Sequence, residues 1–421
     1  MASGRPRRVI EINAHILGPP PPRAKTVRPR KLSDYPHLSR PRGRVASALA
    51  SPLLMGPPLC DELIALVEHL FTEEEARVAQ HLSGLRWRSS AQVARAERRP
   101  VEEVEPLLEA LALQKRAIAC TAPPRRRYRF LPLIPGVFEM ALAGQSPETM
   151  SPWHRRFAAL IEALFETGFH LDYIAAPTAA VRYLPVGGVV DAHPMAIPSD
   201  RLEAVLDRYD VFAVGNCQCR MAAAVAGHAC DRPLGNCMVM GDWARRAVSE
   251  GGLRQVTAAE ALAIKREAES QGLVTWMLNV DSPGGQVSCS CCGCCCKALR
   301  LVNEFGAPSL MAPPHFLPRF DPARCTYCGR CAAQCPMGAI ALDLAKKSFR
   351  HLAARCIGCG LCAVACDRRQ ALAMEPVPDY RVPYRSWFAL ITRSAPAILK
   401  GTWNAWRARG AGWGGRDSRR G

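Results

Sequence analysis

Two stretches of the chain repeat one cysteine spacing, C-x2-C-x2-C-x3-C, and this repeat limits the possible folds more than any other feature. The first stretch, CTYCGRCAAQC, contains Cys325, Cys328, Cys331 and Cys335. The second, CIGCGLCAVAC, contains Cys356, Cys359, Cys362 and Cys366. Thiols spaced this closely on a loop can reach one metal centre, and glycines within the loops let the backbone turn tightly. The repeat therefore indicates a small metal-binding domain.

The repeated spacing resembles that of bacterial-type two-cluster ferredoxins. The resemblance implies that the first three cysteines of each motif bind one 4Fe-4S cluster, whereas the fourth binds the other cluster. Cluster 1 is then bound by Cys325, Cys328, Cys331 and Cys366, and cluster 2 by Cys356, Cys359, Cys362 and Cys335. Asp367 follows Cys366 where the family usually has proline, which affects the loop and the cluster potential rather than metal binding. We expect this ferredoxin domain to occupy residues 313–375.

Composition places these cysteines in a large globular chain rather than in a secreted disulfide scaffold. The chain has 421 residues, 49% of them hydrophobic, and eighteen of its 20 cysteines lie between Cys217 and Cys366. We expect the two outside this range, Cys60 and Cys120, to be ordinary thiols. No apolar stretch of transmembrane length and no secretory signal is evident. Metal-binding thiolates need a reducing compartment, so the expected location is cytoplasmic.

Ten further cysteines lie upstream in two groups, and the sequence leaves their division into sites open. The first group, in NCQCRMAAAVAGHACDRPLGNC, is Cys217, Cys219, Cys230 and Cys237. The second, in CSCCGCCC, is Cys289, Cys291, Cys292, Cys294, Cys295 and Cys296. Because neighbouring side chains diverge, we expect the second group to serve different sites or to remain partly free. Two 4Fe-4S clusters, one cluster plus a zinc ion, or an unusual cluster all fit the ten thiols.

The CxCR segment and the CxCCxCCC segment resemble those of a group of bacterial multi-cluster ferredoxin-like proteins, in which both precede a ferredoxin domain. The resemblance spans residues 58–375 and implies a redox function without indicating a substrate. Arg220 follows Cys219 directly, and its guanidinium is placed to offset cluster charge through hydrogen bonds to sulfur. The alternative is a plain surface arginine.

Residues 58–145 combine three helical patterns with two short strands, and this pattern resembles a winged-helix domain. Capping boxes begin two of the helices, at Thr72 and Ser89, and the strands flank a turn at Pro123–Pro124. The wing, PPRRRYRF, is basic, but the third helix carries glutamates that repel a polyanion. These are Glu102, Glu103, Glu105 and Glu109. We therefore expect protein docking or a structural role, with nucleic-acid binding as the less favoured alternative.

Positive charge is concentrated toward the two ends of the chain. Of the formal net charge of +18, residues 1–50 carry +9 and residues 380–421 carry +8, which leaves +1 for residues 51–379. We expect residues 1–57 to form a basic, proline-rich extended tail and residues 380–421 a basic, tryptophan-containing tail. The net charge is therefore not a nucleic-acid signature of the folded body.

The second tail has an amphipathic helical pattern. Its basic residues Arg393, Lys400 and Arg407 fall in one sector of a helical wheel, opposite Trp387, Ile391, Ile398 and Trp406. Such a helix suits peripheral contact with an anionic membrane surface or docking on a partner, and a solvated tail is the alternative. Pro396 predicts two shorter helices rather than one.

Together these patterns predict an α+β protein with a winged-helix-like domain, a mixed α/β cysteine-rich domain over residues 150–312 and a dicluster ferredoxin fold. The expected function is relay of single electrons through two ferredoxin-type clusters and one or two further clusters, in exchange with a redox protein or an oxidoreductase complex. The sequence leaves open whether the chain is a non-catalytic carrier or an oxidoreductase subunit. A redox-sensing winged-helix transcription regulator is the alternative.

Overall fold

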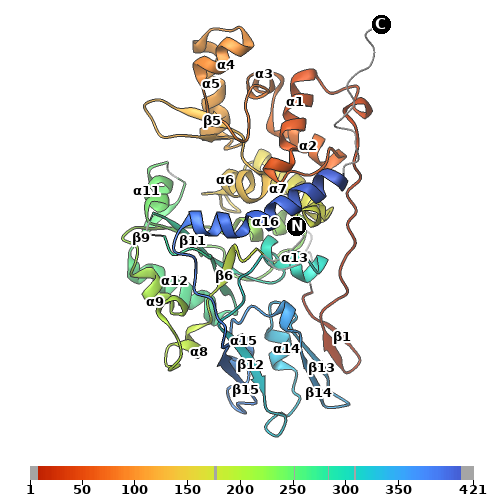
Figure 1. Cartoon of the computed structure of the whole chain (residues 1–421), viewed down its shortest axis with the longest axis vertical. Helices are drawn as coiled ribbons and strands as arrows, with labels where there is room; N and C mark the ends of the chain where they lie inside the picture. Colours follow the sequence, from red (N-terminus) through yellow and green to blue (C-terminus); the bar gives the residue numbers. More distant parts are fainter. Residues whose placement is uncertain (1–7, 175–177, 251, 283, 308–309, 409–421) are drawn as a thin grey trace. The chain divides into compact units, whose positions relative to one another are not determined.

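The computed structural model describes residues 8–174, 178–250, 252–282, 284–307 and 310–408, which form two compact units (Figure 1). The cysteine-rich unit contains the described parts of residues 1–23, 144–146 and 176–398. The helical unit contains those of residues 24–143, 147–175 and 399–421. All eighteen clustered cysteines thus belong to one unit.

The helical unit is built mainly from short helices with apolar inner faces. Its helices are α1 (Arg40–Leu49), α2 (Asp61–Leu70), α3 (Glu73–Ala79), α4 (Ser90–Glu97), α5 (Val101–Glu109), α6 (Phe138–Leu142) and α7 (Pro152–Glu166). The capping boxes predicted at Thr72 and Ser89 are present at the starts of α3 and α4. Each threonine or serine hydroxyl accepts from the backbone N–H three residues on, which fixes where the helix begins.

A small antiparallel sheet completes this unit. Its strands are β3 (Arg88–Ser89), β4 (Ala119–Cys120) and β5 (Arg127–Arg129), in the order β3–β5–β4. The two strands predicted around the Pro123–Pro124 turn are therefore present, and β5 pairs with both of the others. Strands β4 and β5 follow helices α3, α4 and α5 in the chain, whereas β3 lies between α3 and α4.

A six-stranded antiparallel sheet forms the centre of the cysteine-rich unit, with the order β6–β10–β11–β8–β7–β9. Its strands are β6 (Val181–Tyr183), β7 (Phe212–Gly215), β8 (Cys237–Met240), β9 (Arg254–Val256), β10 (Val274–Leu278) and β11 (Gln286–Cys291). Cys289 and Cys291 lie on the central strand β11, and Cys237 begins its neighbour β8. This order, which sequence reasoning did not supply, joins the two upstream cysteine groups.

Helices connect these strands and carry further cysteines. They are α8 (Gly187–Val190), α9 (Leu202–Leu206), α10 (Gln218–Val225), α11 (Asp242–Ser249), α12 (Ala258–Ser270) and α13 (Lys297–Phe305). Cys217 is the N-cap of α10, and Cys296 is the N-cap of α13. A capping box at Thr257 starts α12, which contacts β7, β10 and β11.

The remaining part of the unit contains the two repeated cysteine motifs. Strands β12 (Phe316–Phe320) and β15 (Leu372–Pro376) pair with each other, and helices α14 (Arg330–Gln334) and α15 (Leu361–Val364) follow the two cysteine loops. A second sheet has the order β1–β2–β13–β14. Its strands are β1 (Glu11–Asn13), β2 (Ile16–Gly18), β13 (Ile340–Asp343) and β14 (Ser348–His351). Part of the segment expected to be an extended tail is thus a hairpin that pairs with β13.

One hydrophobic core is shared by the six-stranded sheet and the repeated motifs. Tyr183 and Val274 from the sheet pack with Cys296 and Leu299 from the start of α13, and with Cys359 from the second motif. The backbone N–H of Val186 also donates to the carbonyl of Cys359 at 2.9 Å. The two cysteine-rich regions are therefore packed as one body.

Helix α16 (Trp387–Ala408) begins in the cysteine-rich unit and ends in the helical unit. It is one continuous helix with Pro396 inside it, so the prediction of two shorter helices was wrong. Proline removes one backbone hydrogen bond, and the long runs of helical residues on both sides retain theirs. Residues 409–421 of the predicted tail lie outside the described residues. Among those described, no helix combines the length and apolar character needed to cross a membrane.

Candidate metal centres

The eight cysteines of the repeated motifs surround two separate cavities. One cavity is lined by Cys325, Cys328, Cys331 and Cys366. The other is lined by Cys335, Cys356, Cys359 and Cys362. In each set the last cysteine of one motif faces the first three of the other, because α14 and α15 pack against each other and carry those residues across. The structure brings together the same two sets that the ferredoxin resemblance implies.

Backbone N–H groups in these loops point at sulfur. Tyr327 donates to Cys325 Sγ at 3.3 Å, Ala339 to Cys335 Sγ at 3.2 Å and Gly358 to Cys356 Sγ at 3.5 Å. The left-handed conformations of Gly329 and Gly360, both at φ 79°, begin the helices that follow. Such donors stabilise thiolate charge, so the loops fit a sulfur-ligated cluster.

Burial opposes ionisation of the buried thiols in the two motifs. It raises the pKa of Cys331 to about 12 and that of Cys356 to about 11. The more exposed Cys328 differs, because the backbone N–H of Arg330 lowers the pKa of its thiol. At neutral pH, cluster assembly must therefore displace protons from the buried thiols, which is the usual coupling of metal binding to deprotonation.

A second set of sulfur atoms gathers between the six-stranded sheet, α10 and α13. Each thiol influences the pKa of the next in the order Cys217, Cys219, Cys296, Cys291, Cys289 and Cys237, so the six sulfurs are close neighbours. Cys237 Sγ and Cys289 Sγ are 3.4 Å apart. We call this set the six-sulfur group; it combines three cysteines from each upstream motif.

Buried cations lie beside the six-sulfur group. Lys265, fully buried on α12, donates from Nζ to the carbonyl of Ser288 at 2.8 Å and to Ser290 Oγ at 3.3 Å. Arg220, 2% exposed, donates to the carbonyl of Ser290 at 2.9 Å and to Asn236. Neither cation has an ion pair with a carboxylate among the described residues. Because a buried cation needs nearby negative charge, this environment suits thiolates.

A buried hydroxyl without a partner faces the same group. Tyr183 lies on β6, and its Oη has no hydrogen-bond partner within the described part of the chain. Burial raises the pKa of Tyr183 well above its usual value, and the nearby sulfurs of Cys296 and Cys291 add to the effect. A neutral phenol close to sulfur can donate to a thiolate or sulfide.

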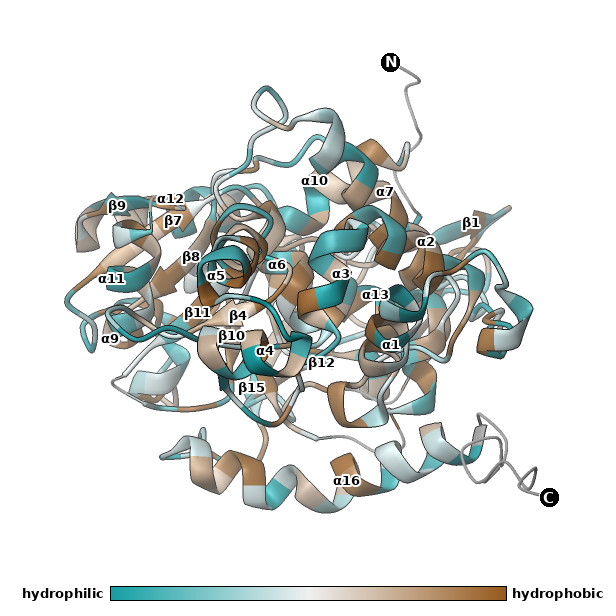
Figure 2. Cartoon of the chain, turned by 90° about the horizontal axis from the view of Figure 1, so that it is seen from above, coloured by the Kyte–Doolittle hydropathy of each residue, from teal (hydrophilic) through white to brown (hydrophobic). Residues whose placement is uncertain are grey.

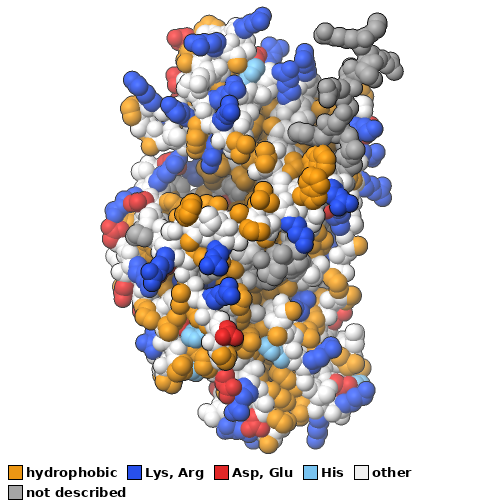
Figure 3. Space-filling model, viewed as in Figure 1, with side chains coloured by type: hydrophobic (Ala, Val, Ile, Leu, Met, Phe, Trp, Pro, Cys, Tyr) orange, Lys and Arg blue, Asp and Glu red, His pale blue; other side chains and the backbone are white. Residues whose placement is uncertain are grey.

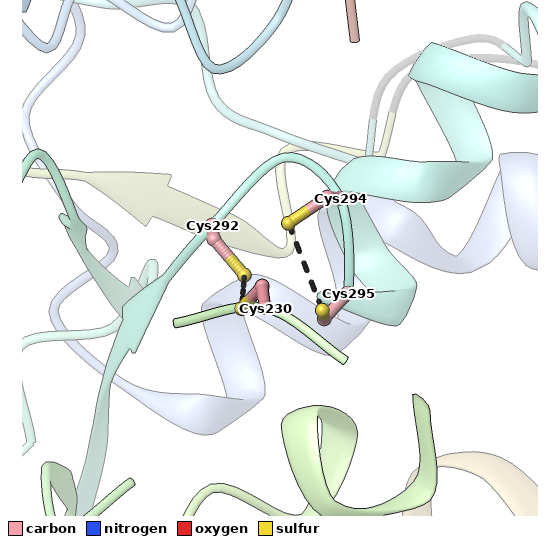
Figure 4. Close-up of side chains that lie close together, drawn as sticks. All are labelled: Cys230, Cys292, Cys294 and Cys295. Carbon is pink, nitrogen blue, oxygen red and sulfur yellow. Dashed lines mark hydrogen bonds between the residues drawn. The ribbon is translucent and has the colours of Figure 1, made fainter. Parts of the chain in front are cut away.

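The remaining four upstream cysteines lie close together in a separate set, which we call the four-sulfur group (Figure 4). Its members are Cys230, Cys292, Cys294 and Cys295, whose sulfur atoms all lie within 4.8 Å of one another. Cys230 Sγ is 4.0 Å from Cys292 Sγ, and Cys294 Sγ is 3.6 Å from Cys295 Sγ. Thiols donating to the sulfur of Cys292 hold its pKa far below the usual range, with Arg220 adding to the effect.

The structure settles how the CSCCGCCC run is divided. Cys289 and Cys291 are two residues apart on β11, so their side chains lie on the same side of the strand. Cys296, at the start of α13, returns to that side. The intervening turn directs Cys292, Cys294 and Cys295 to the other group. Adjacent cysteines therefore diverge at 291–292 and 295–296 as expected, but Cys294 and Cys295 come together because the turn between strand and helix is irregular.

Sequence reasoning missed Lys265 and Tyr183. Lys265 lies in a helix with four other charged residues, where a lysine usually faces solvent. Tyr183 lies in a short strand with no neighbouring motif. Arg220, by contrast, was singled out from its place after Cys219. It is buried and interacts with the sulfurs of Cys217 and Cys292, so it is not a plain surface arginine.

Comparison with known proteins agrees with this geometry in part of the chain. Residues 317–367 match the family model of a 4Fe-4S dicluster domain, and this range contains all eight cysteines of the repeated motifs. The chain therefore carries a ferredoxin-type domain near its C-terminus, which makes it an iron–sulfur protein of the electron-transfer class. No curated protein and no solved structure matches the chain.

Proposed function

We propose that the protein relays single electrons between a redox partner and an internal iron–sulfur centre through two ferredoxin-type 4Fe-4S clusters. The observation that carries this proposal is the arrangement of eight motif cysteines around two cavities, four to each. Two adjacent clusters of one kind suit relay, since each accepts and passes on one electron. The chain then acts as a carrier or as the iron–sulfur subunit of an oxidoreductase complex in the reducing cytoplasm.

The two cysteine sets differ in solvent exposure, and this difference indicates which cluster exchanges electrons with the partner. Cys328, in the set for cluster 1, is exposed, whereas Cys359 and Cys362, in the set for cluster 2, are buried. Cluster 1 is therefore the point of exchange with an external partner. Cluster 2 lies toward the core that Cys359 shares with Cys291 and Cys296 of the six-sulfur group.

The six-sulfur group is the proposed site of a third iron–sulfur cluster. Its thiolates would balance the buried charges of Arg220 and Lys265, and Tyr183 supplies a hydrogen-bond donor. These features support a polynuclear cluster that serves as the inner end of the relay.

Iron and sulfide analysis of the anaerobically purified full chain tests the proposal. Two cubane clusters require about eight irons per chain, and a third cubane raises the total to about twelve. Fewer than about eight would contradict the two-cluster relay, whereas about eight would leave the six-sulfur group without a cluster.

For the helical unit we propose a winged-helix domain that docks on a partner. Helices α3, α4 and α5 with the sheet β3–β5–β4 support the winged-helix assignment. On α5, Glu109 pairs with Arg126 at 3.5 Å, and Glu103 accepts from Arg99 at 3.0 Å. One basic residue of the wing, Arg126, is thus paired with a carboxylate of α5, which reduces the positive charge that the wing offers to phosphates. A mobility-shift assay with oxidised and reduced protein would reveal sequence-preferring DNA binding if the regulator alternative held.

We further propose that α16 contacts an anionic membrane surface. Its exposed apolar side chains form one broad face: Phe388, Ile391, Ile398, Leu399, Trp403 and Trp406. Arg393, Lys400 and Arg407 recur every seventh residue beside this face. The α16 ribbon carries both hydrophobic and hydrophilic residues along its length (Figure 2), and hydrophobic side chains lie next to Lys and Arg side chains on the face of the molecule in Figure 3. Such a helix lies in the interface with its apolar face inserted and its cations near lipid phosphates.

A further inference from the structure

The four-sulfur group has the dimensions of a site for one metal ion. In a tetrahedral zinc–thiolate site, a Zn–S bond of about 2.3 Å places neighbouring sulfurs about 3.8 Å apart. The Cys230–Cys292 and Cys294–Cys295 separations of 4.0 and 3.6 Å lie on either side of that value. Every pair among the four sulfurs lies within 4.8 Å, so all four can reach one ion after small adjustments.

A cubane cluster requires a wider arrangement. Each of its four thiolates binds a different iron and points outward from a separate corner, which keeps the ligand sulfurs farther apart than on a single ion. The two ferredoxin-type sets have this wider arrangement, since the four cysteines of each set line a cavity. Among the described residues, the four-sulfur group is the one set of Cys, His, Asp or Glu whose ligand atoms gather at single-ion spacing.

The surroundings of this group are those of a closed site. Cys292 and Cys295 are buried and pack against small or branched apolar side chains, namely Ala223, Ala268 and Leu273. Four thiolates complete the coordination of a tetrahedral ion and leave no position open for substrate. The guanidinium of Arg220 lies against Cys292 and offsets part of the negative charge of a zinc–tetrathiolate complex.

We propose that Cys230, Cys292, Cys294 and Cys295 bind one structural zinc ion, separate from the iron–sulfur clusters. The ion would join the loop after α10 to the turn between β11 and α13. That turn also carries Cys291 and Cys296 into the six-sulfur group. The zinc ion would therefore hold the inner cluster's ligands in place without itself taking part in electron transfer, because zinc has no redox chemistry.

Metal analysis of the anaerobically purified full chain, combined with zinc-edge X-ray absorption, tests this proposal. We expect about one zinc per chain, surrounded by four sulfurs at about 2.3 Å. Cys230→Ser and, separately, Cys294→Ser should remove the zinc while the ferredoxin-type clusters remain. Cys289→Ser, in the six-sulfur group, is the matched control and should retain zinc.

Several results would overturn the assignment. They are wild-type protein without zinc, a single thiolate-bound iron in its place, or loss of several irons with no loss of zinc in Cys230→Ser. The absorption measurement needs only the wild-type chain, so the proposal stays testable even where a variant does not fold. A correct iron count with no zinc would reject the zinc site and leave the proposed relay intact.

Discussion

Gly293, at the centre of the CSCCGCCC turn, packs directly against the carbonyl group of Pro336, the residue that follows Cys335. Asn303 links the same two residues, since its Nδ2 donates to the carbonyl of Gly293 at 3.0 Å and to that of Pro336 at 2.9 Å. The turn of the upstream cysteine groups is thereby fixed to the loop of the second ferredoxin-type set.

Replacement of Gly293 by alanine should disrupt this junction. An added Cβ would overlap the Pro336 carbonyl, a backbone group that cannot rotate away. We expect a loss of about 1–3 kcal/mol in stability, as for overpacking in a core, seen as a lower midpoint of thermal unfolding of the holo-protein. Gly235→Ala is the matched control, because its Cβ would meet only Asn216 Oδ1 at an ordinary 3.8 Å. Equal stability of the two variants would argue against the junction.

Cys366 lies in the second motif but should serve the cluster of the first. Cys366→Ser is therefore expected to impair the cluster of Cys325, Cys328 and Cys331, with loss of up to about four irons per chain. Electron paramagnetic resonance of the reduced variant should still show the other cluster. Asp367→Pro, which restores the residue usual in the family, should keep the full iron content. Retention of both cluster signals in Cys366→Ser would contradict the crosswise arrangement.

Lys265 should tune the cluster proposed in the six-sulfur group. Reduction adds negative charge to a cluster, and a buried cation stabilises that charge, so Lys265→Met is expected to lower the reduction potential. Arg254→Gln removes one positive charge from an exposed position and provides the control. A potentiometric titration followed by electron paramagnetic resonance measures both. An equal shift in the two variants would show that Lys265 acts only through net charge.

Membrane contact by α16 should depend on both of its faces. Phe388 and Trp403 are 77% and 57% exposed, and Phe388→Ser with Trp403→Ser should weaken sedimentation with phosphatidylserine vesicles. Replacing Arg393, Lys400 and Arg407 by glutamine should reduce binding by up to about a hundredfold, at about 1 kcal/mol per cation. Ile12→Ser, at an exposed apolar position on β1, should have no effect. Binding that is equally strong to neutral vesicles would contradict the role of the cations.

Cys60 should be unreactive in the native protein. It is 1% exposed, and burial raises the pKa of its thiol to about 12. The thiolate that alkylating reagents attack is therefore scarce at pH 8 and becomes available only well above it. Mass spectrometry should find Cys60 unmodified by iodoacetamide until the chain is unfolded, with Cys120, which is also buried, behaving alike. Rapid native labelling of Cys60 would show that this part of the helical unit opens readily.

Local patterns predicted what local chemistry controls. The capping boxes at Thr72 and Ser89 begin helices as expected, because both hydrogen bonds of each box join residues only three apart in the chain. The helix through Pro396 could not be foreseen, since local propensity assigns proline a cost without weighing the turns on either side. The pairing of Ile16–Gly18 with β13 was also missed, as it joins segments more than three hundred residues apart.

The metal centres likewise divide into features that local sequence predicts and features that only long-range packing sets. By itself, the sequence determined the ferredoxin-type domain, because the spacing C-x2-C-x2-C-x3-C places three thiols on one short loop and occurs twice. Only the tertiary structure decided how the ten upstream cysteines divide. Strand β11 pairs with β8 and so brings Cys289 beside Cys237, while the turn after β11 directs Cys292 toward Cys230. Which thiols meet depends on strand order and on a turn between a strand and a helix, and these are set by long-range packing.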